Sequence, residues 1–130
     1  MKPVPILSLA DYQILRELSK NSINVSNAKE LTQLSGELDR AIIVKEGLPE
    51  NNVVQINSFL EIEDVKAQKR MKIQIVLPSL ANIKEAKVSV LAPLSIALIG
   101  FKENDEVEWD LPAGMKTLRI IAVTNSVANN

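Results

Sequence analysis

Gly47-Leu48-Pro49 marks the point in the chain at which the spacing of apolar residues changes. Before it, apolar residues recur every three or four positions, the period of a helix that packs on one face. After it, apolar and polar residues alternate, the period of a strand with one buried face. A glycine closely followed by a proline also ends a helix. The chain is therefore predicted to divide into a helical part, residues 1–48, and a sheet domain, residues 49–130.

Two helices are predicted before this boundary. The first begins at Ser8, because residues 8–11 approximate a capping box, and it ends near Lys20. The second begins at Asn27, and its roughly 17 residues give a length of about 26 Å. Each helix carries one apolar stripe, so we expect an antiparallel hairpin, a short coiled coil. The stripes comprise Leu7, Ala10, Ile14 and Leu18, with Leu15 beside them, and Leu31, Leu34, Leu38 and Ala41.

Strand patterns follow one another after Pro49. Alternating apolar residues predict strands near residues 54–56, 60–62, 71–77, 88–90, 107–111 and 118–123. Residues 93–100 interrupt this series with a proline start, a glycine stop and a helical apolar face. We therefore predict an α+β fold in which a small antiparallel sheet, with one face in water, covers one short helix.

The composition excludes several kinds of chemistry. The 130 residues contain no histidine and no cysteine, which rules out a Ser-His-Asp triad, a Cys/His zinc site and disulfides. The net charge of -1 and the 3% aromatic content provide neither the basic field nor the stacking surface typical of nucleic-acid binding. No apolar run approaches the ~18 residues of a membrane span, and the N-terminus does not resemble a signal peptide. A cytoplasmic protein without membrane contact is expected.

Two charged clusters each have a structural and a functional interpretation. The acidic run at residues 103–110 favours a solvated strand face over a cation site, because calcium ligands usually converge from a loop. The basic cluster at residues 66–72 favours a solvated hairpin turn over a nucleic-acid contact. The four glycines form no phosphate-binding loop. The residues therefore favour a binding module over an enzyme, with no catalytic residue, cofactor or metal.

Four segments carry a resemblance to a known family. They are Glu37-Leu38-Asp39-Arg40-Ala41, Val53 to Ser58 (V-V-Q-I-N-S), Ser89 to Gly100 (S-V-L-A-P-L-S-I-A-L-I-G) and Trp109 to Pro112 (W-D-L-P). In this order they resemble the C-terminal domain of the Gre transcription elongation factors, and most closely a short relative, the regulator of nucleoside diphosphate kinase. The resemblance covers about residues 30–124. Ser95, Asn104 and Ala113 stand where glycine is usual, and asparagine tolerates left-handed backbone.

The resemblance implies an FKBP-like sheet domain, an N-terminal coiled coil and binding to RNA polymerase near its secondary channel. In the Gre factors, acidic residues at the tip of a longer coiled coil bind a catalytic magnesium ion. The predicted tip of this chain, Lys20 to Asn27, contains no Asp or Glu. We therefore expect a bacterial, non-enzymatic transcription regulator that does not stimulate transcript cleavage and competes with Gre factors.

The candidate partner-binding residues lie in two places. We expect the polymerase rim to be contacted by Ala92, Pro93, Leu94 and Ser95, with Asp105 nearby, and the channel mouth by the tip residues Ile23, Asn24 and Val25. DNA is expected to be reached only through the polymerase. Two alternatives remain open: a Gre-like cleavage or prolyl isomerase activity, and an interaction module for another protein such as a kinase.

Overall fold

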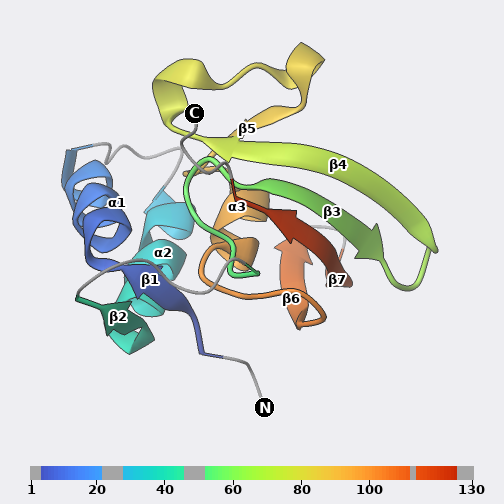
Figure 1. The fold of residues 1–130 in the computed structure, drawn as a ribbon, viewed down its shortest axis with the longest axis horizontal. Helices are drawn as coiled ribbons and strands as arrows, with labels where there is room; N and C mark the ends of the chain where they lie inside the picture. Colours follow the sequence, from blue (N-terminus) through green and yellow to red (C-terminus); the bar gives the residue numbers. More distant parts are fainter. Residues whose placement is uncertain (1–3, 22–27, 46–51, 112–113, 126–130) are drawn as a thin grey trace.

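The computed structural model describes residues 4–21, 28–45, 52–111 and 114–125 (Figure 1). The predicted mixture of helices and strands is confirmed. The described elements, in chain order, are β1 (Ile6–Ser8), α1 (Leu9–Asn21), α2 (Ala28–Arg40), β2 (Ile42–Val44), β3 (Phe59–Asp64), β4 (Lys69–Val76), the 3-10 turns η2 (Pro78–Leu80) and η3 (Ile83–Glu85), β5 (Lys87–Ser89), α3 (Pro93–Leu98), β6 (Glu106–Leu111) and β7 (Gly114–Thr124).

Within the described residues, five strands form one sheet in the order β5-β4-β3-β7-β6. Strand β3 pairs antiparallel with β4 and β7, and β6 pairs antiparallel with β7. Strand β5, however, runs parallel to β4, so the prediction of a purely antiparallel sheet is wrong at this edge. The cause is the connection: residues 77–86 cross over between these strands, whereas an antiparallel pair can be joined by a tight turn.

The predicted alternation is confirmed for residues 60–62, 73–75 and 118–120, whereas Met71 is 48% exposed and the side chains of residues 109–111 lie outside the described residues. One face of the sheet is buried against α3, which lies behind it in Figure 1, and the other face meets water. In β3, for example, Leu60 and Ile62 are buried, whereas Phe59 is about half exposed. The buried sheet residues comprise Leu60, Ile62, Ile73, Ile75, Val76, Val107, Leu118, Ile120 and Val123.

Helix α1 begins as predicted but turns a different face to the core. The Oγ of Ser8 accepts a hydrogen bond from the Asp11 N–H at 3.0 Å, which confirms the N-cap. Leu15 is buried and Leu18 packs against the core, whereas Ala10 and Ile14 are exposed, so the predicted stripe is wrong at these two positions. The reason is that Leu7 belongs to strand β1 and therefore does not fix which face of the helix is buried.

Helix α2 buries its predicted seam but is shorter than predicted. Leu34 and Leu38 are buried, while the side chain of Leu31 lies outside the described residues. The helix ends at Arg40, and its 13 residues span about 20 Å. The following residues, Ile42–Val44, pair in parallel with β1 instead of continuing the helix. These β-branched side chains favour a strand over a helix.

The strand predicted around Val54 is wrong, because Val53 forms only an isolated bridge with Lys102 and the chain then turns, with Ser58 buried and Asn57 exposed. Val54 is held by residues 100 and 101, whose backbones pair with its C=O and N–H at 2.9 and 2.7 Å. Asn57 has a φ of 77°, a left-handed conformation that asparagine tolerates better than most residues. The buried Ser58 Oγ accepts the Gln55 N–H at 2.7 Å and thereby closes the turn.

The helices and the sheet share one buried core. Leu15 of α1 and Leu34 of α2 belong to the same cluster of buried side chains as Val54 and Ile96. A hydrogen bond also joins the two parts, because Asp11 Oδ2 accepts the Ile56 N–H at 3.1 Å. The division at residues 48/49 remains a prediction, which a cooperative unfolding experiment can test.

The part-buried hydrogen bond between Asp11 and the Ile56 N–H predicts that the stability of the fold depends on pH. Burial raises the pKa of the Asp11 carboxyl, against the opposing effect of the hydrogen bond from Ile56. An acid with a raised pKa in the folded state costs stability as the pH rises from about 4, its unfolded value, through the folded value. Asp11→Asn keeps an oxygen acceptor and abolishes this titration. We therefore expect the variant to gain stability relative to the wild type between pH 3.5 and pH 7, measured by urea unfolding. A wild type that gains on the variant over this range would refute the assignment.

Candidate partner-binding surface

The loop before α3 presents a proline at the surface in a fixed position. The Oγ of Ser89 accepts the Leu91 N–H at 3.1 Å, and the Ser89 C=O accepts the Ala92 N–H at 2.9 Å, so the chain turns tightly here. Val90 anchors the loop, since it is fully buried and its N–H donates to Val76 O at 2.8 Å. Pro93 follows as the first residue of α3, where its missing N–H carries no cost, and its side chain is exposed.

The four predicted docking residues of this loop differ in their accessibility. Ala92 and Leu94 are half-buried, and Leu94 packs against the core. Ser95 is fully buried, and its Oγ has no hydrogen-bond partner among the described residues. The part of the predicted set that a partner can reach is therefore Pro93, with the edges of Ala92 and Leu94.

Asp105 uses its carboxylate in its own turn. Its Oδ2 accepts the Lys102 N–H at 3.0 Å, and its backbone bonds both Lys102 and Ile120. Asn104, the preceding residue, stands where glycine is usual in the family that the sequence resembles. Its φ of 74° is left-handed, a conformation that asparagine tolerates. Although α3 packs against β6, no hydrogen bond or ion pair among the described residues joins Asp105 to residues 92–95.

The tip residues Ile23, Asn24 and Val25 lie outside the described residues, as do Ala113 and the beginning of the predicted second helix at Asn27. What the structure describes of the helical part is the packing of α1 against α2. The Arg16 side chain lies between them and bonds Tyr12 Oη at 3.0 Å, Ser35 Oγ at 3.4 Å and the Asp39 carboxylate. The hydrogen bond that Arg16 donates to the Asp39 carboxylate raises the pKa of Arg16, which therefore stays charged.

The segments that carry the family resemblance are largely structural. In the E-L-D-R-A segment, Glu37 pairs with Arg40 at 3.1 Å, and Asp39 pairs with Arg16 across the two helices. In V-V-Q-I-N-S, Ser58 Oγ donates to Asn125 Oδ1, and the amide of Asn125 donates to Val53 O at 3.0 Å. These residues hold the fold together, so their presence indicates a shared architecture and says less about a partner.

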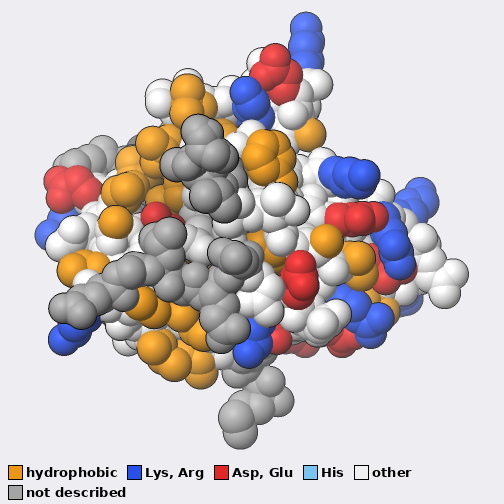
Figure 2. Space-filling view, viewed as in Figure 1, with side chains coloured by type: hydrophobic (Ala, Val, Ile, Leu, Met, Phe, Trp, Pro, Cys, Tyr) orange, Lys and Arg blue, Asp and Glu red, His pale blue; other side chains and the backbone are white. Residues whose placement is uncertain are grey.

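The acidic run does not converge on a common point. Glu103 Oε2 accepts the Val123 N–H at 2.8 Å, and Glu106 pairs with Arg119 on the neighbouring strand at 2.5 Å. Among the described residues, no three carboxylates lie together as cation ligands. The basic cluster lies at the β3–β4 turn, where its side chains are exposed. Figure 2 shows charges of both signs interspersed at this end of the sheet, which is typical of a solvated surface.

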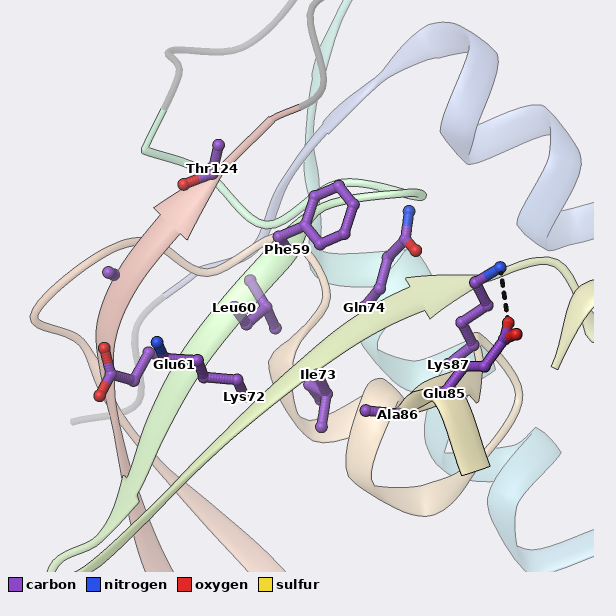
Figure 3. A pocket seen from close by; sticks show the side chains of 11 residues that line it. Phe59, Leu60, Glu61, Lys72, Ile73, Gln74, Glu85, Ala86, Lys87 and Thr124 are labelled. Atoms are coloured by element: carbon purple, nitrogen blue, oxygen red, sulfur yellow. Dashed lines mark ion pairs between the residues drawn. The ribbon is translucent and has the colours of Figure 1, made fainter. Parts of the chain in front are cut away.

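The solvent-facing side of the sheet carries a groove that the sequence patterns did not predict (Figure 3). It has a volume of about 460 Å³ and is open to solvent. Strands β3, β4 and β7 form its floor, and residues 85–87 form one wall. The lining residues that project into it include Phe59, Glu61, Lys72, Gln74, Glu85 and Lys87. A half-exposed phenylalanine on an otherwise polar strand face was the one signal that could have located it.

Comparisons with known proteins agree with this architecture. A family model described as transcription elongation factor GreA/GreB, C-terminal, matches residues 49–125. The chain is 34% identical over 95 residues to the transcription inhibitor protein Gfh1 of Thermus aquaticus, over 72% of this chain and 59% of that protein. It is 28% identical over 130 residues to transcription elongation factor GreA of Hyphomonas neptunium, over 94% of this chain and 82% of that protein. The chain thus spans about three fifths of the length of the Gfh1 relative.

Solved structures give the same result for the whole described fold. A prokaryotic GreA/GreB elongation factor from Nitrosomonas europaea superposes with a TM-score of 0.74 at 29% identity, covering 95% of this chain and all of that one. A structure of the transcription factor Gfh1 superposes with a TM-score of 0.53 at 26% identity, over 96% of this chain. Both likenesses extend beyond residues 49–125 and include the helical part.

Proposed function

Because the chain belongs to the GreA/GreB family of transcription elongation factors, we propose that it is a non-enzymatic regulator that binds RNA polymerase near the secondary channel. In this proposal the FKBP-like sheet domain docks on the polymerase rim through the exposed Pro93 loop. The helical part then lies at the channel mouth. The family match over most of the sheet domain supports polymerase as the partner, since GreA and Gfh1 are both named for an effect on transcription.

The observation that carries the non-enzymatic part is the absence of acids at the predicted tip. Residues 20–27 contain no Asp or Glu, so they offer no carboxylate to a magnesium ion. Helix α2 is also only 13 residues long, about 20 Å. A short arm without carboxylates lacks the means by which Gre factors stimulate cleavage. We therefore propose that the protein inhibits transcript cleavage by occupying the Gre site, as a short Gre relative of the kind represented by the regulator of nucleoside diphosphate kinase.

The named relative Gfh1 supports the direction of this effect, since it is called a transcription inhibitor. Among the described residues, no helix is long and apolar enough to cross a membrane.

The proposed function can be tested by a cleavage assay on stalled bacterial elongation complexes with GreA as the positive control. We expect no RNA cleavage from this protein alone and a concentration-dependent loss of GreA-stimulated cleavage. Cleavage by the protein itself would refute the proposal. In a pull-down from bacterial lysate with this protein as bait, a kinase captured without polymerase subunits would support the alternative partner.

Pro93→Asp should weaken polymerase binding by about tenfold or more, because it places a charge in the centre of the contact. Aspartate is favoured in the first turn of a helix, so α3 should persist and the melting temperature should change by less than about 2 °C. Binding can be measured by biolayer interferometry with core polymerase. Gln68→Asp is the matched control, since Gln68 is exposed at the far β3–β4 turn. Equal affinities of both variants and the wild type would remove Pro93 from the contact.

A further inference from the structure

The segment between β4 and β5, residues 77–86, projects from the body of the molecule as a flap (Figure 1). It carries two large apolar side chains in water: Leu80 is 56% exposed and Ile83 is 88% exposed. Among the large hydrophobic side chains that the structure describes, Ile83 is the most exposed. The flap therefore presents an apolar tip.

Backbone hydrogen bonds hold the flap in shape. Asn82 and Lys87 exchange two N–H···O bonds, both of 2.9 Å, which close the outer loop at its base. The Asn82 side chain accepts the Lys84 N–H at 3.1 Å, and Ala81 N–H donates to Pro78 O at 3.2 Å. Because the backbone is already ordered, a partner that buries the tip meets little additional entropic cost.

Neither local propensity nor packing explains an isoleucine at position 83. Turns favour Gly, Pro, Asn, Asp and Ser, and Asn82 and the left-handed Ala86 already define this one. A side chain that is 88% exposed buries almost no apolar area within the chain. Contact with another surface would remove this area from water.

The foot of the flap forms one wall of a groove that is lined by polar residues and Phe59. The groove described above lies here, with Phe59 beside Gln74 on one side and residues 85–87 on the other (Figure 3). At its rim, Lys87 Nζ pairs with Glu85 Oε1 at 3.1 Å, so the two charges neutralise each other. The tip thus combines Leu80 and Ile83 with one exposed lysine, Lys84, a composition that fits a protein surface with an apolar pocket.

The flap and the Pro93 loop lie close enough to belong to one interface. Strand β5 begins at the base of the flap, and the six steps from Lys87 to Pro93 span at most about 20 Å. Ile83 follows Asn82, the bridge partner of Lys87, so it lies within about 30 Å of Pro93. A typical interface covers about 800 Å² on each partner, or roughly 30 Å across. We propose that the flap is a second contact with RNA polymerase, in which Leu80 and Ile83 enter an apolar pocket beside the Pro93 site. The choice of partner rests on the proposed function.

The test compares a flap variant with a matched variant elsewhere. Leu80→Ser combined with Ile83→Ser should weaken the affinity for core polymerase by about tenfold to a hundredfold, the value of burying one large aliphatic side chain. Met115→Ser is the control, because Met115 is similarly exposed (59%) but lies at the start of β7. It should change the affinity by less than about twofold, as expected outside an interface. Circular dichroism should show unchanged melting for both variants.

A second measurement does not depend on loss of binding. A photo-crosslinking amino acid placed at position 83 should form a covalent product with a polymerase subunit, whereas the same probe at position 115 should not. If the wild type binds but the double variant binds equally well, or the position-83 probe does not crosslink, the flap proposal is wrong and the proposed function stands. If the wild type does not bind polymerase, the proposed function fails and this assignment fails with it.

Discussion

Gly100→Ala is expected to lower the free energy of unfolding by at least about 3 kcal/mol and to detach strand β1. Gly100 ends the α3 segment with a φ of +86°, where an L side chain is strained. An added Cβ would also lie 2.6 Å from the Cβ of Pro5 and 3.1 Å from the Ile6 nitrogen. Both effects act together here, because the chain start passes directly over this glycine.

Urea unfolding and hydrogen exchange together check this expectation. The Ile6 N–H donates to Gly100 O at 2.7 Å, and the Ile42 N–H donates to Pro5 O at 2.9 Å. If the methyl group displaces the chain start, both amides should exchange faster in the variant under native conditions. Fast exchange limited to these two positions would indicate local detachment, whereas a general increase would indicate lower global stability.

Substitutions of two other glycines distinguish the cost of backbone strain from the cost of the steric clash with Pro5. Gly114→Ala meets nothing within 4 Å but has a φ of +133°, so it should cost only the strain, about 1–3 kcal/mol. Gly36→Ala lies in α2 with open space around it and should stabilise the protein by about 0.5–1 kcal/mol. A Gly100 variant as stable as the Gly114 variant would show that Pro5 gives way without cost.

The sheet is the part of the fold that the sequence predicts well. In β3, β4 and β7, buried residues alternate with more exposed ones over part of each strand, so the alternation of apolar and polar residues carries the assignment. Strand β1, by contrast, is only three residues long and pairs with residues 42–44 through long-range backbone bonds. Three residues are too few to show a periodicity, so the sequence pattern assigns Leu7 of this strand to the apolar stripe of the following helix.

The candidate site is less predictable, for a different physical reason. Pro93 is exposed as expected, but its neighbour Ser95 points into the core and Asp105 bonds its own turn. A helix one and a half turns long presents some residues outward and others inward, and the sequence does not give its rotation. The shapes of the groove and the flap cannot be predicted from the sequence patterns, because they depend on how strand β5 crosses over beside β4, although Phe59 on a polar strand face signals the groove.

Leu34→Ala is expected to lower the free energy of unfolding by about 2–5 kcal/mol, through lost burial and the cavity left behind. Leu34 is fully buried in α2, which packs against α3 beneath the sheet. It belongs to the same buried cluster as Leu60 and Ile96. Damage in the helical part should therefore destabilise the sheet as well, and the chain should unfold as one cooperative unit rather than as two domains divided at residue 48.

Two probes follow the two parts in one urea titration. The only tryptophan of the chain, Trp109, lies in β6 and reports on the sheet, while circular dichroism at 222 nm is dominated by the helices. In wild type and in Leu34→Ala the two transitions should coincide and shift together. Ile14→Ala, at a 38% exposed position of α1, should change stability by less than about 0.5 kcal/mol. A helical transition that moves alone would establish the helical part as an independent domain, because a shared core cannot lose one half without weakening the other.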